Sequence, residues 1–307
     1  MADCSIEIAS VRLANPLIAA AGTTGYGPEL AEIADLRNLG ALTTKSITKD
    51  GREGNDPWRV VDLPAGMLNA IGLANIGLDR FLDDVVPELG QLDTVVIGSI
   101  AGHTIEEYVA VASAFDPIDA LPLVELNISC PNTETGKDFN DDPERMVQLL
   151  SAVRSELKHT PMIVKFSPGS ANLTTLVIKA IEAGADAICL GNTMPAISVD
   201  PETGQSRIGR HAGGLSGPGL HPIAAKLVHD VYVHMQKSSR HVPLIATGGV
   251  TCWEDAAEFI LLGADAVGMG TVLMADPHAP VRINKGLRNW VQRKGGDLAS
   301  LRGSFRQ

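Results

Sequence analysis

The sequence has no excess of positive charge and no long apolar run. Its 307 residues include 25 lysines and arginines against 36 aspartates and glutamates, a formal net charge of -11. An acidic chain repels phosphate backbones, which argues against nonspecific nucleic-acid binding. No segment approaches the roughly 18 apolar residues of a membrane span. The N-terminus carries Asp3 and Glu7 where a signal peptide has basic residues. We therefore expect a cytoplasmic protein that binds neither nucleic acid nor a membrane.

The sequence is also poor in cysteine. Its four cysteines are widely separated, with no C-x-x-C pair: Cys4, Cys130, Cys189 and Cys252. This pattern favours reduced thiols over a disulfide framework or a zinc site, and it lacks the closely placed thiolates of an iron–sulfur cluster. His229, His234 and His241 have no recognised ligand spacing, so we interpret them as part of a solvated helix face rather than a metal site.

Eight short apolar segments alternate with longer helical patterns along the chain. They begin at Pro16, Ala41, Thr94, Leu123, Met162, Ala187, Pro243 and Ala266. Between them lie segments with 3.6-residue periodicity, such as 143–157 after the good N-cap Asp142, and 253–263, where Gly263 is a natural helix stop. Eight strand–helix units in succession predict a (β/α)8 TIM barrel.

A doubly wound sheet is the alternative fold. A near repeat weighs against it, because EAGADAICLGN (182–192) and LLGADAVGMGT (261–271) suit the quasi-symmetry of a barrel. The length fits one barrel or two domains of about 150 residues each. No Gly/Ser-rich or Pro-rich linker divides the chain, so we predict a single domain over residues 1–307.

A barrel carries its active site at the C-terminal ends of its strands. The tips of the predicted strands hold Gly22, Lys45, Ser46, Ser99, Asn127, Cys130, Lys165, Asn192, Thr193, Gly248, Gly249, Gly270 and Thr271. Asparagine amides can grip a flat polar ligand, and a thiol can move a proton. A strand that simply ends in an Asn/Pro turn with a buried cysteine is the plainer interpretation. Two lysines in otherwise apolar strands are unusual, and a bound anion or an electron-rich ring would supply their partner.

Glycines gather at the tips of the last two predicted strands. GGLSGP (213–218), TGGV (247–250) and GMGT (268–271) are typical of tight strand–helix turns. Phosphate sites in barrels are built from the same loops with backbone N–H groups, so these glycines favour a phosphate-bearing cofactor. No G-x-G-x-x-G opens a helix after the first strand, which favours a mononucleotide over a dinucleotide.

These motifs, together with GMLNAIGLANIG (66–77), resemble the class 1 dihydroorotate dehydrogenases, and the B type more than the A type. The resemblance runs nearly from end to end. It implies an FMN cofactor and the oxidation of dihydroorotate to orotate in pyrimidine synthesis. It also implies a homodimer, and a partner subunit that carries FAD and an iron–sulfur cluster and passes electrons to NAD.

The resemblance assigns Cys130 as the catalytic base. A free thiol is only a few per cent ionised at neutral pH. Because a nearby lysine would lower the pKa of Cys130, we expect Lys45 to be a second catalytic residue. The resemblance implies that hydride leaves the substrate for the flavin while Cys130 removes a proton. The positions that match the family's substrate contacts are Lys45, Asn69, Ala70, Ile71, Gly72, Leu73, Asn127, Asn192 and Thr193. Asn132 lies in the same loop as Cys130, and we expect it to join them.

A second set of positions matches the family's FMN contacts. It comprises Ala21, Lys45, Ser46, Ser99, Asn127, Lys165, Leu190, Gly217, Gly248, Gly249, Gly270 and Thr271, with Ala21 and Leu190 acting through their backbone. Ser99 departs from the pattern, because B-type sequences often place asparagine there. The departure puts one side-chain contact to the flavin in doubt.

The sequence also allows other functions. A-type enzymes use fumarate and need no partner. A barrel like that of dihydropyrimidine dehydrogenase can carry serine at position 99, although GMLNAIGL disfavours it. The membrane-bound class 2 form uses a serine base, which Cys130 replaces here. A phosphate-binding isomerase or lyase without flavin would be colourless. A catalytically silent binding subunit would not need Cys130, Lys45 and Lys165.

Overall fold

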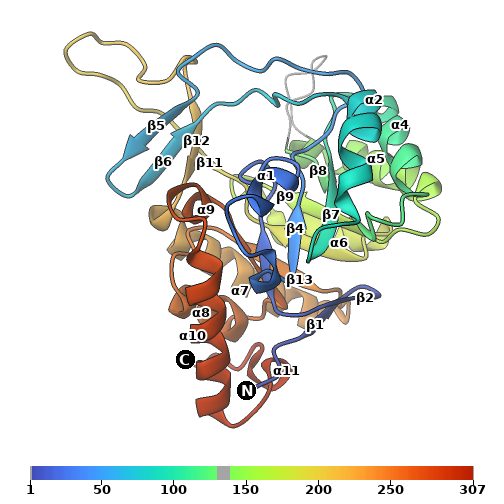
Figure 1. Ribbon diagram of the computed structural model, residues 1–307, viewed down its shortest axis with the longest axis vertical. Helices are drawn as coiled ribbons and strands as arrows, with labels where there is room; N and C mark the ends of the chain where they lie inside the picture. Colours follow the sequence, from blue (N-terminus) through green and yellow to red (C-terminus); the bar gives the residue numbers. More distant parts are fainter. Residues whose placement is uncertain (1, 130–138, 307) are drawn as a thin grey trace.

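The computed structural model describes residues 2–129 and 139–306. Eight parallel strands close into a barrel in the order β10-β13-β14-β3-β4-β7-β8-β9 (Figure 1). They are β3 (Leu17–Ala19), β4 (Ala41–Thr43), β7 (Val95–Ile100), β8 (Leu123–Asn127), β9 (Met162–Phe166), β10 (Ala187–Leu190), β13 (Leu244–Thr247) and β14 (Ala266–Met269). Each lies within one of the eight predicted segments. The barrel prediction is confirmed, and the doubly wound sheet is wrong because β14 pairs with β3 and closes the sheet.

Helices follow the barrel strands and cover them on the outside. They are α1 (Pro28–Ala31), η1 (Leu36–Asn38), α2 (Leu78–Arg80), η2 (Phe81–Val85), α3 (Val86–Leu89), α4 (Ile105–Phe115), η3 (Phe139–Asp141), α5 (Pro143–Glu156), α6 (Leu173–Glu182), η4 (Pro218–Leu220), α7 (His221–Ser238), α8 (Trp253–Leu261), α9 (Thr271–Ala275), α10 (Ala279–Lys294) and α11 (Leu298–Leu301). The predicted helices are confirmed: the Asp142 side chain accepts a bond of 3.1 Å from the N–H of Arg145, and Gly263 follows α8 with φ of +116°.

The barrel strands bury both faces, and alternate residues point to opposite sides. Val124, Leu126 and Val164 face outward and share a cluster with residues of α5 and α6. Leu123 and Ile163 face inward and pack with residues of the N-terminal hairpin of β1 (Ile6–Ile8) and β2 (Val11–Leu13). The hairpin thus fills the N-terminal end of the barrel and leaves the other end for the site.

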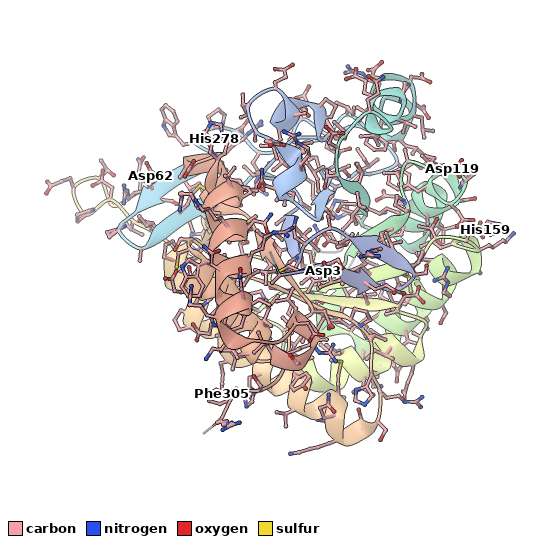
Figure 2. All side chains as sticks on the ribbon, turned by 60° about the horizontal axis from the view of Figure 1, so that its bottom comes forward. Asp3, Asp62, Asp119, His159, His278 and Phe305 are labelled. Atoms are coloured by element: carbon pink, nitrogen blue, oxygen red, sulfur yellow. The ribbon has the colours of Figure 1, made fainter. Side chains whose placement is uncertain are left out.

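A four-stranded antiparallel sheet stands beside the C-terminal end of the barrel, in the order β11-β12-β6-β5. Its strands are β5 (Val60–Leu63), β6 (Gly66–Asn69), β11 (Met194–Ala196) and β12 (Gly213–Ser216). Figure 1 shows β5 and β6 projecting at the upper left, while both chain ends lie below, and Figure 2 places Asp62 on the same outlying sheet. The sequence did not predict this sheet, because its strands are short, partly exposed and rich in glycine.

The C-terminal segment forms the amphipathic helix α10, which packs against α8 as the last long element of the barrel wall. Its buried face includes Ile283, Leu287 and Trp290. Within residues 2–129 and 139–306, no helix has both the length and the apolar character needed to cross a bilayer.

Candidate active site at the C-terminal end of the barrel

A polar layer lies directly above the apolar floor of the barrel. Ala41, Ile97, Leu123, Ile163, Ala187 and Ile245 belong to the cluster that fills the barrel's N-terminal end. Because side chains two residues apart share a face of a strand, the next inward residues are Thr43, Ser99, Glu125, Lys165, Cys189 and Thr247. The sequence therefore changes from apolar to polar along the same inner faces, at one depth in the barrel.

Lys165 and Glu125 form a buried ion pair inside this layer. Lys165 Nζ lies 3.2 Å from Glu125 Oε1, and their side chains are 7% and 5% exposed. Burial alone would lower the pKa of Lys165, but the Glu125 carboxylate raises it above its ordinary value. We expected a bound anion or an electron-rich ring as the partner of this lysine, and the structure adds a partner within the chain, Glu125. The register pairs Lys165 with Asn127, which brings Glu125 onto the same inner face.

Cys189 lies beside this pair and is held as a neutral thiol. It is opposite Lys165 in the register, and its Sγ is 3.8 Å from Thr247 Oγ1. Burial, followed by the nearby Glu125 carboxylate, raises the pKa of Cys189 to about 12. A thiol with that pKa is a poor base or nucleophile at neutral pH. We interpret Cys189 as part of the barrel packing.

Amide and hydroxyl groups at the tips of β8 and β10 form one hydrogen-bonded cluster. Asn127 Oδ1 accepts bonds from Ser129 Oγ at 2.8 Å and from Asn192 Nδ2 at 3.2 Å. Asn192 Oδ1 accepts from the N–H of Thr193 at 2.8 Å, and Tyr108 donates to the Asn127 carbonyl. No hydrogen bond between the described residues uses the Nδ2 donors of Asn127. The cluster thus fixes both asparagines and leaves donors for a ligand.

The C-terminal end of the barrel is called the mouth below, and its neighbouring part is formed by Lys45, Ser46 and Ser99. The Ser46 and Ser99 hydroxyls are 2.8 Å apart, and both residues are buried. Lys45 is half-buried, and its Nζ would lie 3.6 Å from a Cβ placed on Gly22. The structure therefore brings Lys45 over the tip of β3. The hydroxyl of Ser99 therefore has a partner within the protein, the hydroxyl of Ser46, which is also a predicted flavin contact.

Asn69 reaches this end of the barrel from the antiparallel sheet. It ends β6, and its Nδ2 donates to the Gly214 carbonyl of β12 at 3.1 Å. A Cβ on Gly214 would lie 1.8 Å from Thr193 Oγ1, so the sheet approaches the tip of β10 closely. The unpredicted sheet thus links two of the predicted substrate positions, Asn69 and Thr193.

The segment after Asn69 is held in a fixed shape. Asn55 donates through Nδ2 to the Ala70 carbonyl and through its N–H to the Ile71 carbonyl, both at 3.0 Å. Gly72 and Leu73 follow with φ of +75° and +56°, a conformation that costs a leucine more than a glycine. Strained residues such as Leu73, in a segment held by hydrogen bonds, are typical of segments that contact a ligand.

The opposite side of the mouth is built from backbone rather than side chains. We call Lys45, Ser99, Asn127, Lys165 and Asn192 the side-chain half, and Gly217, Gly248, Gly249 and Gly270 the glycine half. A Cβ on Gly249 would lie 2.8 Å from the Gly217 carbonyl oxygen, and one on Gly248 2.7 Å from Ala224 Cβ. Thr271 donates to Ser216 Oγ at 2.9 Å beside them. The glycines predicted for the cofactor site therefore lie close together on this side of the mouth.

The remaining predicted positions fall in three places. Leu190 faces outward into the barrel wall, so only its backbone is available at the mouth. Ala21 is partly exposed just after β3. Cys130 and Asn132 lie outside the described residues.

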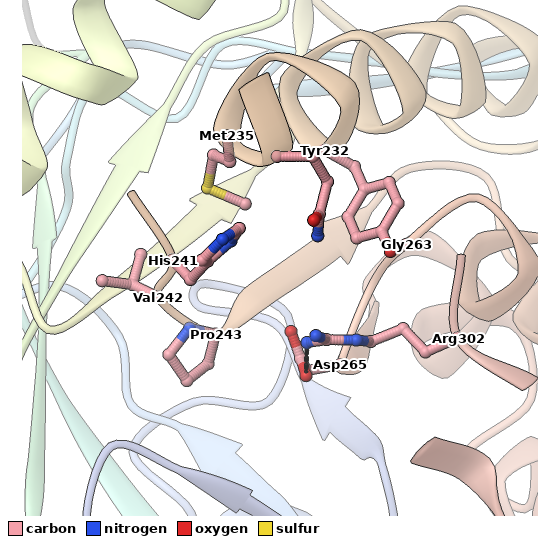
Figure 3. A pocket seen from close by; sticks show the side chains of 9 residues that line it. Tyr232, Met235, His241, Val242, Pro243, Gly263, Asp265 and Arg302 are labelled. Atoms are coloured by element: carbon pink, nitrogen blue, oxygen red, sulfur yellow. Dashed lines mark hydrogen bonds and ion pairs between the residues drawn. The ribbon is translucent and has the colours of Figure 1, made fainter. Parts of the chain in front are cut away.

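A pocket of about 190 Å³ lies at the other end of the barrel, lined by residues that include Tyr232, His241 and Asp265 (Figure 3). Pro243 directly precedes β13, and Asp265 directly precedes β14. Asp265 pairs with Arg302 there. This pocket contains none of the predicted site residues, and it is separate from the mouth.

Comparison with known proteins identifies the family. The dihydroorotate dehydrogenase family profile matches residues 4–291. A putative dihydroorotate dehydrogenase A (fumarate) of Aquifex aeolicus is 38% identical over 291 residues, covering 94% of each chain. The catalytic subunit of dihydroorotate dehydrogenase B (NAD(+)) from Geotalea uraniireducens is 38% identical, over 99% of this chain and 98% of the relative. The same subunit from Bacteroides thetaiotaomicron is 36% identical over 96% of both. This chain belongs to the dihydroorotate dehydrogenase family.

The predicted family and enzyme class are thereby confirmed, and dihydroorotate dehydrogenases are generally flavin-dependent. Two residues of this dihydroorotate dehydrogenase family member were missed at the mouth. Glu125 carried a visible signal, a carboxylate in the middle of an otherwise apolar strand. His221 carried no such signal in the sequence, because its partners on α8 are more than thirty positions away along the chain.

Proposed function

We propose that residues 1–307 act as one FMN-binding unit that oxidises dihydroorotate to orotate. The observation that carries the proposal is the meeting of two surfaces at one end of the barrel. The side-chain half offers amides and cationic groups for a flat polar ring, and the glycine half offers close backbone approach for a phosphate. Family membership supports the same pairing of cofactor and substrate.

The residues of the mouth fit FMN. Gly248 and Gly249 pack so closely against Ala224 and Gly217 that a side chain would not fit at either position. Their backbone, with Gly217 and Thr271 beside it, would form a phosphate cradle. Lys165 would hold positive charge near the isoalloxazine ring, with Ser46, Ser99 and Lys45 beside it. FMN supplies the acceptor for the hydride that the substrate gives up. Ala21, Leu190 and Gly270 would contribute backbone contacts.

The amides of the mouth fit the substrate. Orotate is a planar diamide with a carboxylate, so Asn69, Asn127 and Asn192 could pair with its edges, with Thr193 beside them. The Nδ2 group of Asn127 still has donors to give, and Asn192 is fixed by its own bonds. The segment 70–73 and Asn132 would close the remaining side. Held in this way, the substrate ring would be oriented for proton removal by Cys130.

We propose Cys130 as the general base. A free thiol is only a few per cent ionised at neutral pH, so a nearby cation is needed to favour the thiolate. Lys45 supplies that cation in the proposal, because its side chain lies at the same mouth over the tip of β3. Cys189, with a pKa of about 12, is the less suitable thiol.

The electron acceptor separates two forms of the proposal. The relatives from Geotalea and Bacteroides are named NAD(+) catalytic subunits, which favours a partner subunit that carries FAD and an iron–sulfur cluster. The Aquifex relative is named a putative fumarate enzyme, which makes fumarate the second candidate. We propose the NAD-linked form, and a homodimer as the catalytic core.

Purification of the chain alone tests this proposal. A yellow protein that releases FMN supports it, whereas a colourless one that cannot be reconstituted favours a phosphate-binding isomerase or lyase. Dihydroorotate oxidation is then measured with fumarate, with NAD and with a dye. We expect activity with the dye alone, and with NAD only after the partner subunit is added. Rapid turnover with fumarate would instead assign the A type.

A further inference from the structure

The side chain of His221 lies behind the glycine half, at the start of α7. Its Nδ1 is 3.0 Å from the carbonyl oxygen of Gly248, and its Nε2 is 3.2 Å from Glu258 Oε2. Asp255 Oδ1 is 4.0 Å from the same Nε2. The ring is only 12% exposed and packs against Phe259 with 4.7 Å between ring centroids. These contacts with Gly248, Glu258 and Phe259 therefore fix the orientation of the ring.

Both ring nitrogens of His221 face acceptors. A backbone carbonyl can only accept a hydrogen bond, and so can an ionised carboxylate. The bond to Gly248 therefore needs a hydrogen on Nδ1, and the ring donates it to the carbonyl oxygen. The carboxylates of Glu258 and Asp255 lie on the other side of the ring, next to Nε2.

This bond also fixes the direction of the next N–H. The Gly248 carbonyl and the Gly249 N–H belong to one peptide unit, and in a trans peptide they point to opposite sides. With the carbonyl turned toward His221, the Gly249 N–H points away from the ring. No hydrogen bond between the described residues uses that N–H, and Gly249 lies against Gly217.

The other end of the same loop is anchored independently. Asp255 Oδ2 accepts bonds from the backbone N–H groups of Thr251 and Cys252, at 2.7 and 3.1 Å. Burial alone would raise the pKa of Asp255, but these bonds and the Thr251 hydroxyl lower it, so the group stays ionised. Among the described residues, His221 supplies the side-chain hydrogen bond at the glycine end of this loop.

We propose that His221 is a positioning residue for the cofactor phosphate. It turns the Gly248–Gly249 peptide so that the Gly249 N–H is presented to the phosphate of FMN. This inference rests on the proposed function, because it needs FMN at the mouth. It predicts that His221 matters for the phosphate of the cofactor and not for its ring.

The test compares FMN with riboflavin, which lacks the phosphate. Apoprotein of the full chain is titrated with each flavin, and binding is followed by flavin fluorescence. For His221→Ala we expect the FMN dissociation constant to rise about tenfold, the size of one hydrogen bond. Riboflavin binding should stay within about twofold of wild type, which also reports that the variant is folded.

Two further variants complete the test. His221→Asn keeps a donor near the Nδ1 position and should restore most of the FMN affinity. His234→Ala removes a histidine about three and a half turns further along α7 and should change nothing. FMN affinity unchanged in His221→Ala, equal losses for FMN and riboflavin, or no rescue by asparagine would overturn the inference. A wild-type chain that binds no FMN would instead overturn the proposed function.

Discussion

The two halves of the barrel mouth are built by different means. In the side-chain half, charged, amide and hydroxyl groups lie at the C-terminal ends of β4, β7, β8, β9 and β10, and several are held by hydrogen bonds within the protein. In the glycine half, side chains are absent where the backbone must come close. We infer that substitutions in the first half should alter the chemistry or the stability of the site, whereas those in the second should alter retention of the cofactor phosphate.

The largest expected effect is on the chemistry. Cys130→Ala should slow reduction of bound FMN by dihydroorotate by roughly 10² to 10⁴, the usual size of a general-base contribution. FMN content should stay normal, because the glycine half is untouched. Stopped-flow absorbance under anaerobic conditions measures the rate. A reduction rate near wild type at saturating substrate would remove Cys130 from its role.

The buried ion pair should dominate the stability of the side-chain half. Lys165→Met leaves the Glu125 carboxylate without its partner in a site only 5% exposed. The free energy of unfolding of the apoprotein should fall by about 3–5 kcal/mol. The double variant Lys165→Met/Glu125→Gln should recover a large part of that loss. Urea denaturation measures both, and a double variant no more stable than the single one would show that the two side chains are not coupled.

A single methyl group should impair the glycine half. Gly249→Ala adds a Cβ at φ of +70°, with backbone atoms of His221 and Gly217 within 2.8 Å. We expect FMN binding about tenfold weaker or more, because the added Cβ would displace the backbone from the position that meets the phosphate. The left-handed conformation itself costs roughly 1–2 kcal/mol of stability.

Gly204→Ala is the matched control, because Gly204 has φ of +67° and no atom within 4 Å of the added Cβ. It should lose stability without losing FMN, as equilibrium dialysis of FMN and thermal unfolding can show. Equal FMN affinity in the two variants would contradict the close-approach role of Gly249.

The smallest expected effect concerns Ser99. Ser99→Ala removes the hydroxyl that bonds Ser46 in a buried site, so unfolding should become easier by about 1 kcal/mol. Ser155→Ala removes an exposed hydroxyl that bonds only its own helix and should stay within about 0.5 kcal/mol of wild type. Equal denaturation midpoints for the two variants would show that the Ser46–Ser99 hydrogen bond does not stabilise the fold.

Much of the mouth was predictable because one rule governs a parallel barrel. Strands buried on both faces are continuous apolar runs, and any polar residue near their C-terminal ends stands out. Lys45, Asn127 and Lys165 stood out in this way, and the structure places them at one end of the barrel. The predicted glycines lie there too, because their spacing follows the last two strands.

The parts that were missed depend on contacts between distant residues. Glu125 could be seen in its strand, but its pairing with Lys165 depends on the register between β8 and β9. Strand β12 contains two glycines in four residues, so its pattern resembles a turn. His221 gains its contacts only when α7 and α8 pack together. Local sequence patterns carry no information about such packing.

Anaerobic mixing of the purified, FMN-loaded chain with dihydroorotate tests the proposed function most directly. We predict rapid bleaching of the visible flavin absorbance, and little bleaching with dihydrouracil, which lacks the carboxylate. A flavin that stays oxidised with dihydroorotate, or that is reduced faster by dihydrouracil, would contradict the proposed function.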